Sequence, residues 1–203
     1  MKTKVLSLFT IAALTVAASA APQTFNFKDP KGVNNAVFKL DAPLEAINGS
    51  ANGISGTVTF DPADPGATKG KIVIATSSLH LPNPTMKEHM LGNQWLDAEA
   101  NKEITFEAKS LANVKTTGDN TSADVSGTLT IKGVAKEITA PVKFTYLKDK
   151  LGQRVPNQKG DLLVIRANFA IQRGDFGINP KAPTDKVADT IDLTLSIAGA
   201  SPK

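Results

Sequence analysis

The sequence predicts an all-β fold, a single antiparallel barrel of about eight strands with one short helix. Apolar and polar residues alternate with a period of two over most of the chain after residue 20, which is typical of half-buried strands. Clusters of Gly, Asn, Pro and Asp separate these segments, and few of the stretches between them have a helical pattern. Strands that follow one another in this way form an antiparallel meander, which hides its edges by closing into a barrel.

The first twenty residues are predicted to be a cleaved signal peptide. Lys2 and Lys4 precede an apolar run from Leu6 to Ala18, and Ala18-Ser19-Ala20 is an Ala-x-Ala cleavage site. The apolar run is shorter than the ~20 residues that a membrane-spanning helix needs. Cleavage would leave residues 21–203 as one exported domain.

The composition argues against several classes of function. Loss of Lys2 and Lys4 lowers the formal net charge from +4 to +2, and the remaining basic residues form no stripe suited to nucleic acid. There is no cysteine, so disulfides and thiol chemistry are excluded. His80 and His89 lack metal-ligand spacing, and no nucleophile elbow, zinc-protease motif or phosphate loop occurs. We therefore expect no metal site, no required cofactor and no enzymatic activity.

Strands in the first half of the chain have a weaker but recognisable pattern. Turn-forming clusters separate them, as at Asn48-Gly49 and from Asp61 to Gly66. The predicted strands are 23–28, 35–41, 53–60, 70–77 and 103–111.

One short helix is predicted at residues 86–91. Thr85 and Glu88 have the spacing of a capping box, and Gly92 is a suitable stop. Met86 and Met90 are four residues apart and share one face of this helix, with His89 beside them.

Strands in the second half of the chain alternate most clearly. They are predicted at 125–132, 137–145, 161–172 and 191–197, with a tight turn at 132–136. Loop 174–189 is expected at a barrel mouth. The apolar face of these strands carries Val125, Leu129, Ile131, Ile138, Ala140, Val142, Phe144, Leu163, Ile165, Ala167, Phe169, Ile171, Ile191, Leu193, Leu195 and Ile197.

The apolar face is expected to point inward. A membrane barrel carries aromatic girdles at both interfaces, whereas this chain has one Trp and one Tyr. A barrel of about eight strands has an interior that holds side chains or one small ligand. Gly127, Ala140 and Ala167 are small inward residues, which favours an interior with free space over a filled core.

Three motifs occur in a characteristic order. The first runs from Met86-Lys87-Glu88-His89-Met90-Leu91 through Trp95-Leu96-Asp97-Ala98 to Ile104-Thr105-Phe106, the second is Gly127 to Gly133 with Lys136, and the third is Phe169 to Ile178. Phe60-Asp61-Pro62 follows the third strand. Together these motifs resemble the YceI-like family of bacterial periplasmic proteins over nearly all of residues 21–203. The family often has Asp before the helix histidine, where this chain has Glu88.

This resemblance implies a lipocalin-like barrel in the periplasm that binds a polyisoprenoid, a polyprenyl chain or a quinone-like lipid, in an elongated apolar tunnel. The resemblance implies no catalytic residue for this sequence. The expected partner is an isoprenoid lipid, with no nucleic acid and no integral membrane segment. The sequence does not fix the oligomeric state, and a homodimer is compatible with it.

Candidate ligand-binding residues come from the apolar faces and from the predicted mouth. The tunnel is expected to be lined by Phe60, Phe106, Leu129, Phe144 and Phe169. Met90 and Trp95 are expected near an opening, because Met adapts to irregular apolar ligands and Trp suits a half-wet edge. The residues expected at the mouth are His89, Arg173, Asp175 and Phe176.

Other interpretations stay open on sequence alone. Arg173 has a fork of donors suited to a phosphate or carbonyl head group, but it could equally form a structural ion pair with Asp175. An enzyme acting on a lipid or small apolar substrate, using His89 or Arg173 with Asp175, is a second candidate. A stress-related interaction protein with a filled core is a third.

Overall fold

A computed structural model describes residues 21–203, so the predicted signal peptide lies outside the described residues. These residues form one eleven-stranded antiparallel sheet with two short α-helices. The strands are β1 (Gln23–Asn26), β2 (Asn35–Asp41), β3 (Ala46–Ala51), β4 (Ile54–Phe60), β5 (Lys69–Ala75), β6 (Leu79–His80), β7 (Glu103–Thr117), β8 (Asn120–Ile131), β9 (Val134–Leu147), β10 (Gly160–Gln172) and β11 (Thr190–Pro202). The α-helices are α1 (Pro84–Leu91) and α2 (Leu151–Arg154), and the 3-10 helices are η1 (Pro65–Ala67), η2 (Thr76–Ser78) and η3 (Gly174–Phe176).

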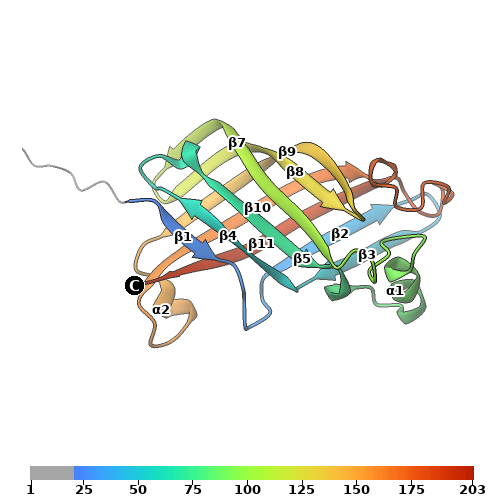
Figure 1. The fold of residues 1–203 in the computed structure, drawn as a ribbon, viewed down its shortest axis with the longest axis horizontal. Helices are drawn as coiled ribbons and strands as arrows, with labels where there is room; N and C mark the ends of the chain where they lie inside the picture. Colours follow the sequence, from blue (N-terminus) through green and yellow to red (C-terminus); the bar gives the residue numbers. More distant parts are fainter. Residues whose placement is uncertain (1–20) are drawn as a thin grey trace, which may run out of the picture.

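Eight of the strands close into a barrel, as the sequence predicts. Their order is β1-β4-β5-β7-β8-β9-β10-β11, and β1 returns to β11 where Asn26 lies opposite Ala200. β2, β3 and β6 continue the sheet beyond β11. In Figure 1, α2 and the C-terminus lie at one end of the barrel, called here the closed end. α1 and the loop between β10 and β11 lie at the other, called the mouth end.

The seam of the barrel depends on one buried side chain. β1 and β2 both pair with β11, and residues 27–34 bulge out between them. The Asn34 side chain is 2% exposed, accepts from the Ala198 N–H at 2.9 Å and donates to the carbonyls of Ala198 and Phe27 at 3.1 and 3.0 Å. It therefore supplies the ladder bonds that the bulge interrupts.

The predicted alternation is confirmed by the way the strands are buried. Alternate residues of β8 are buried along most of its twelve residues, and Val125, Leu129 and Ile131 are among them. Lys132 and Gly133 have φ values of 51° and 74°, the backbone of a two-residue hairpin turn with both central residues left-handed. This turn fixes the register of β8 against β9.

The structure corrects several details of the first half. β3 was not predicted, because Asn48-Gly49 is typical of a turn. Gly49 instead lies within a strand, and a Cβ there would come within 2.1 Å of the Phe38 ring. β6 was not predicted either, and in the second half of the chain α2 is an additional element. α1 begins earlier than predicted, since the Asn83 side chain, not Thr85, caps it by accepting from the Met86 N–H at 3.1 Å.

Candidate functional site

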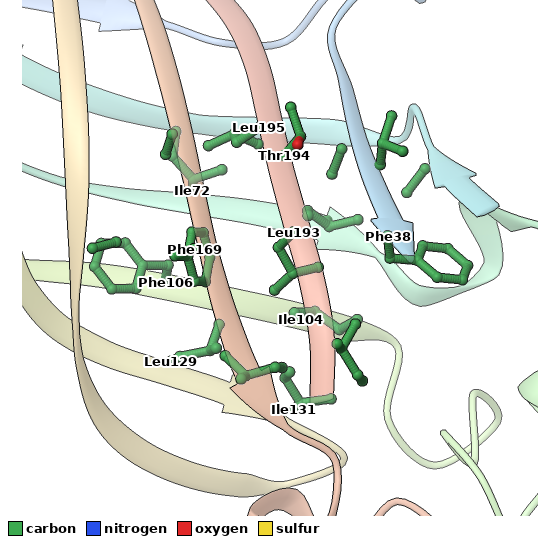
Figure 2. A pocket seen from close by; sticks show the side chains of 18 of the residues that line it. Phe38, Ile72, Ile104, Phe106, Leu129, Ile131, Phe169, Leu193, Thr194 and Leu195 are labelled. Carbon is green, nitrogen blue, oxygen red and sulfur yellow. The ribbon is translucent and has the colours of Figure 1, made fainter. Parts of the chain in front are cut away.

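An apolar cavity of about 460 Å³ occupies the barrel between its middle and the mouth end. Inward-facing side chains from β2, β5 and all of the strands from β7 to β11 line it. Figure 2 shows Phe106, Leu129 and Phe169 on its wall, each from a different strand. The lining is aliphatic and aromatic except for a few polar side chains, and the titratable ones are Glu45, His89 and Arg173.

The closed end of the barrel is filled. Phe25, Phe27 and Leu163 are 0% exposed and belong to a cluster that also contains Phe60 and Phe144. The rings of Phe60 and Phe144 stack with centroids 5.8 Å apart and an interplanar angle of 28°. Such packing leaves no passage along the barrel axis toward α2.

Small residues create part of the space in the cavity, though not all of those predicted to do so. Ala140 and Ala167 line the cavity. Gly127 does not contribute free space to the cavity, because a Cβ on Gly127 would lie 2.3 Å from the Glu107 carbonyl oxygen and 2.8 Å from the tip of the Phe106 ring. The missing side chain of Gly127 thus allows the Glu107 backbone and the tip of the Phe106 ring to approach β8 closely.

The mouth end is covered by α1 and the segment that follows it. No residue of α1 is buried, although Met86, His89 and Met90 all line the cavity. His89 is exposed, as is Glu45 in the turn between β2 and β3, so the cavity reaches solvent at this end. The helix therefore forms a thin cover with few buried contacts.

Arg173, directly after β10, is 1% exposed and lies on the cavity wall. Its guanidinium is 5.7 Å from the centroid of the Trp95 ring, a cation–π arrangement. Among residues 21–203 it forms no ion pair. Its five donor bonds go to backbone carbonyls of Ile178, Asn179, Ala182, Val187 and Ala188.

These bonds show what Arg173 does in the fold. A guanidinium has five N–H donors, and all of them are used, so none is free for a head group. Asp175 is exposed on η3 and does not pair with Arg173, so the ion pair considered from the sequence is not formed. Arg173 shapes the loop at the mouth and leaves its charge beside the cavity.

Lys132 joins the two segments that cover the mouth. Its Nζ donates to the carbonyls of Gln94 and Gly177, each at 3.1 Å. The N–H of Asn179 also donates to the Gln94 carbonyl, at 3.1 Å. The β8–β9 turn therefore fastens the segment after α1 to the loop after β10.

The structure brings most of the predicted ligand-binding residues together. Those that line the cavity are His89, Met90, Trp95, Phe106, Leu129, Phe144, Phe169 and Arg173. Phe60 lies outside it, beneath Phe144, and Phe176 also does not line it but is buried in a second hydrophobic cluster that includes Ile178. Sequence reasoning missed Phe38, Ile72 and Ile104 as lining residues. The alternation of inward and outward residues in β5 and β7 would have identified Ile72 and Ile104 as inward-facing.

A polar network fastens the C-terminus to the closed end. The Asp161 carboxylate is 0% exposed and accepts from the Tyr146 hydroxyl and the Asp149 N–H, both at 2.8 Å, and from the Lys203 Nζ at 2.9 Å. Burial by itself raises the pKa of Asp161, but these hydrogen bonds to the charged form outweigh it and lower the pKa to about 2. None of these four residues lines the cavity.

The described residues contain neither a cluster of metal-ligating side chains nor a helix long enough to span a membrane. Within residues 21–203, no three His, Asp or Glu side chains gather as a metal site would require. The helices of this described part are all too short to cross a bilayer.

Comparison with known sequences gives a consistent match. A family model described as a YceI-like domain matches residues 24–198. A UPF0312 protein of Pseudomonas paraeruginosa is 31% identical over 153 residues, which cover 75% of this chain and 73% of that protein. A UPF0312 protein of Pseudomonas putida is 30% identical over 157 residues, which cover 77% of this chain and 75% of the relative.

Solved structures share the fold. The crystal structure of Burkholderia cenocepacia BcnA has a TM-score of 0.62 at 24% identity, covering 81% of this chain and 94% of BcnA. The Campylobacter jejuni YCEI protein has a TM-score of 0.61 at 23% identity, and the match covers 100% of both chains. A polyisoprenoid binding domain from Saccharophagus degradans has a TM-score of 0.64 at 12% identity, and the match covers 90% of this chain and 100% of that domain.

Proposed function

Because this chain belongs to the YceI-like domain family, we propose that it binds a long-chain isoprenoid lipid, either a polyprenyl chain or an isoprenoid quinone, in its apolar cavity. The observation that carries this proposal is the cavity of about 460 Å³ with an apolar lining. Ordinary protein interiors are close-packed and contain few voids larger than a water molecule. The volume falls in the range of roughly 300–1,000 Å³ that is usual for small-molecule sites.

The chemistry of the lining supports a hydrocarbon ligand. Burial of each methylene contributes about 0.8 kcal/mol, so a tail enclosed over part of its length binds tightly. The titratable lining groups, Glu45, His89 and Arg173, all lie at the mouth end, where a polar head group stays in contact with water. The structural likeness to a protein described as a polyisoprenoid binding domain agrees with this ligand class.

The proposed role is that of a carrier in the periplasm, without catalysis. An isoprenoid lipid is nearly insoluble in water, so a protein that encloses its tail keeps it dispersed. No observation favours the enzyme or the filled-core interaction protein: His89 is exposed, and the Arg173 donors are occupied by carbonyls. Both residues remain proposed ligand neighbours, His89 by position and Arg173 by its charge.

The test of lipid binding is mass spectrometry of the organic extract from purified protein. We expect an isoprenoid lipid in the wild-type extract and much less in Ala140→Trp, since Ala140 lines the cavity and the indole would occupy it. Circular dichroism checks that the variant is folded. A wild-type extract without lipid, together with no uptake of a polyprenol probe, would overturn the proposal.

The proposed location has a separate test. If residues 1–20 are a signal peptide, N-terminal sequencing of the protein from a periplasmic fraction begins at Ala21. Protein that starts at Met1 and remains in the cytoplasm would contradict export without bearing on lipid binding.

A further inference from the structure

Four residues of the cavity lining also belong to the packed cluster at the closed end. They are Val58, Val125, Phe144 and Ile165, and each is at most 6% exposed. These side chains therefore form the floor of the cavity. Beneath them the interior is solid, as Phe25, Phe27 and Leu163 are 0% exposed and Phe60 is 2% exposed.

The floor is held in place by an aromatic stack. Phe144 is the largest floor residue, and its ring rests on Phe60 at a centroid distance of 5.8 Å. Phe60 does not line the cavity, so it supports Phe144 from below. Because Phe60 is 2% exposed and lies outside the cavity, Phe144 has no free volume beneath it into which it could turn to let a ligand pass toward the closed end.

Polarity fixes which end of a lipid reaches this floor. Thr68 is the polar side chain buried at the closed-end side of the cavity, and its hydroxyl already donates to the Pro65 carbonyl at 2.6 Å. A head group there would lose its hydration without gaining a donor. The apolar end of the lipid therefore enters first and stops at Phe144.

From these contacts we infer that the Phe60–Phe144 stack sets the maximum length of isoprenoid tail that the barrel encloses. The inference rests on the proposed function, and it assigns a specificity role to two residues at the base of the cavity. Affinity should rise with each isoprene unit until the tail reaches Phe144. Further isoprene units extend past α1 into solvent and add little to the affinity.

A series of isoprenoid alcohols tests this directly. Geraniol, farnesol, geranylgeraniol and longer polyprenols differ by whole isoprene units, and the change in fluorescence of Trp95, the single tryptophan, reports binding at the cavity wall. While the tail is still being enclosed, we expect each unit to tighten binding at least about tenfold. Beyond a break point the affinity should stay constant.

Two floor variants should move this break point in opposite directions. Phe144→Ala deepens the cavity, so the break shifts to a longer alcohol by one unit or more. Val125→Phe raises the floor and shifts it to a shorter one. Phe169→Ala is the matched control, since it removes the same atoms from the cavity wall and should change affinity without moving the break. Phe144→Leu provides a milder variant if Phe144→Ala does not fold.

The outcomes separate the two proposals. If the wild type binds no member of the series, the proposed function fails. If the wild type shows a break point that stays at the same alcohol in Phe144→Ala or Phe144→Leu and in Val125→Phe, lipid binding stands but the role of the floor is wrong. A shift in Phe169→Ala equal to that in Phe144→Ala would also overturn it, because width rather than depth would then select the tail.

Discussion

In the half of the barrel next to α2, Phe25, Phe27 and Leu163 are fully buried, whereas Phe106 and Phe169 in the half next to α1 remain partly exposed to the cavity. The same long strands, β8 to β10, form both halves. Strand pairing therefore continues without interruption along the barrel, while the barrel interior changes from a solid core to an open cavity. Stability should come mainly from the closed end, and binding from the mouth end.

The largest expected effect is a difference between two leucine truncations. Leu163→Ala should lower the free energy of unfolding by about 2–5 kcal/mol, because it creates a cavity in a packed site. Leu193→Ala enlarges a space that already exists, so its loss in free energy of unfolding should be less than about half that of Leu163→Ala. Urea unfolding of both variants measures this, and equal losses would show that the two halves are equally well packed.

Enlargement of small residues should give the next largest difference. Ala123 belongs to the closed-end cluster, whereas Ala167 lines the cavity. Ala123→Phe should destabilise the protein by about 1–3 kcal/mol through overpacking. Ala167→Phe should leave the unfolding midpoint nearly unchanged and reduce lipid uptake. The comparison fails if Ala167→Phe is the more destabilising of the two in the same denaturation assay.

Acid should weaken the closed end through Asp161. Its folded pKa of about 2 lies below the ordinary value of 3.8, so its contribution is complete above pH 3.8 and is lost as the pH falls toward 2. This lowering of the Asp161 pKa corresponds to at most about 2 kcal/mol of folding stability. The contribution is smaller in practice, because its partner Lys203 is half-exposed.

The measurement is urea unfolding of the wild type and Asp161→Asn as a function of pH. Asp161→Asn should lose stability near neutral pH and should lack the part of the acid dependence that Asp161 supplies. Asp149→Asn is the control, because Asp149 also bonds Lys203 but its side chain is 65% exposed. An acid dependence that is the same in wild type and Asp161→Asn would show that Asp161 does not stabilise the fold.

The sequence predicted the inward faces well because alternation is a local property of a strand. Leu129, Phe144 and Phe169 face inward as period two requires. Alternation carries no information on depth, so Phe60 was placed on the tunnel wall together with Phe106. Only the three-dimensional register shows that Phe60 lies beneath Phe144 while Phe106 covers Gly127.

The mouth was harder to predict because backbone groups dominate its contacts. A motif shows that Arg173 and Asp175 are close in sequence, but the Arg173 donors go to carbonyls of the following loop, which no residue pattern encodes. Lys132 likewise bonds carbonyls of segments about 40 residues away along the chain. Contacts of this kind depend on where the loops lie and not on which residues form them.

The smallest expected effect on stability is at the mouth, in Lys132→Asn. Asn tolerates the left-handed backbone at φ 51° and forms with Gly133 a favoured hairpin turn, so only the two bonds to Gln94 and Gly177 are lost. Each such bond contributes roughly 0.5–1.5 kcal/mol when fully formed, and less at a partly exposed site, so global stability should fall by about 1 kcal/mol or less. Amide hydrogen exchange should nevertheless accelerate in residues 92–98 and 174–179, and stay unchanged in β10 near Leu163. Uniform acceleration in both regions would mean that Lys132 supports the whole barrel, and the separation between a stabilising closed end and an adaptable mouth would then be wrong.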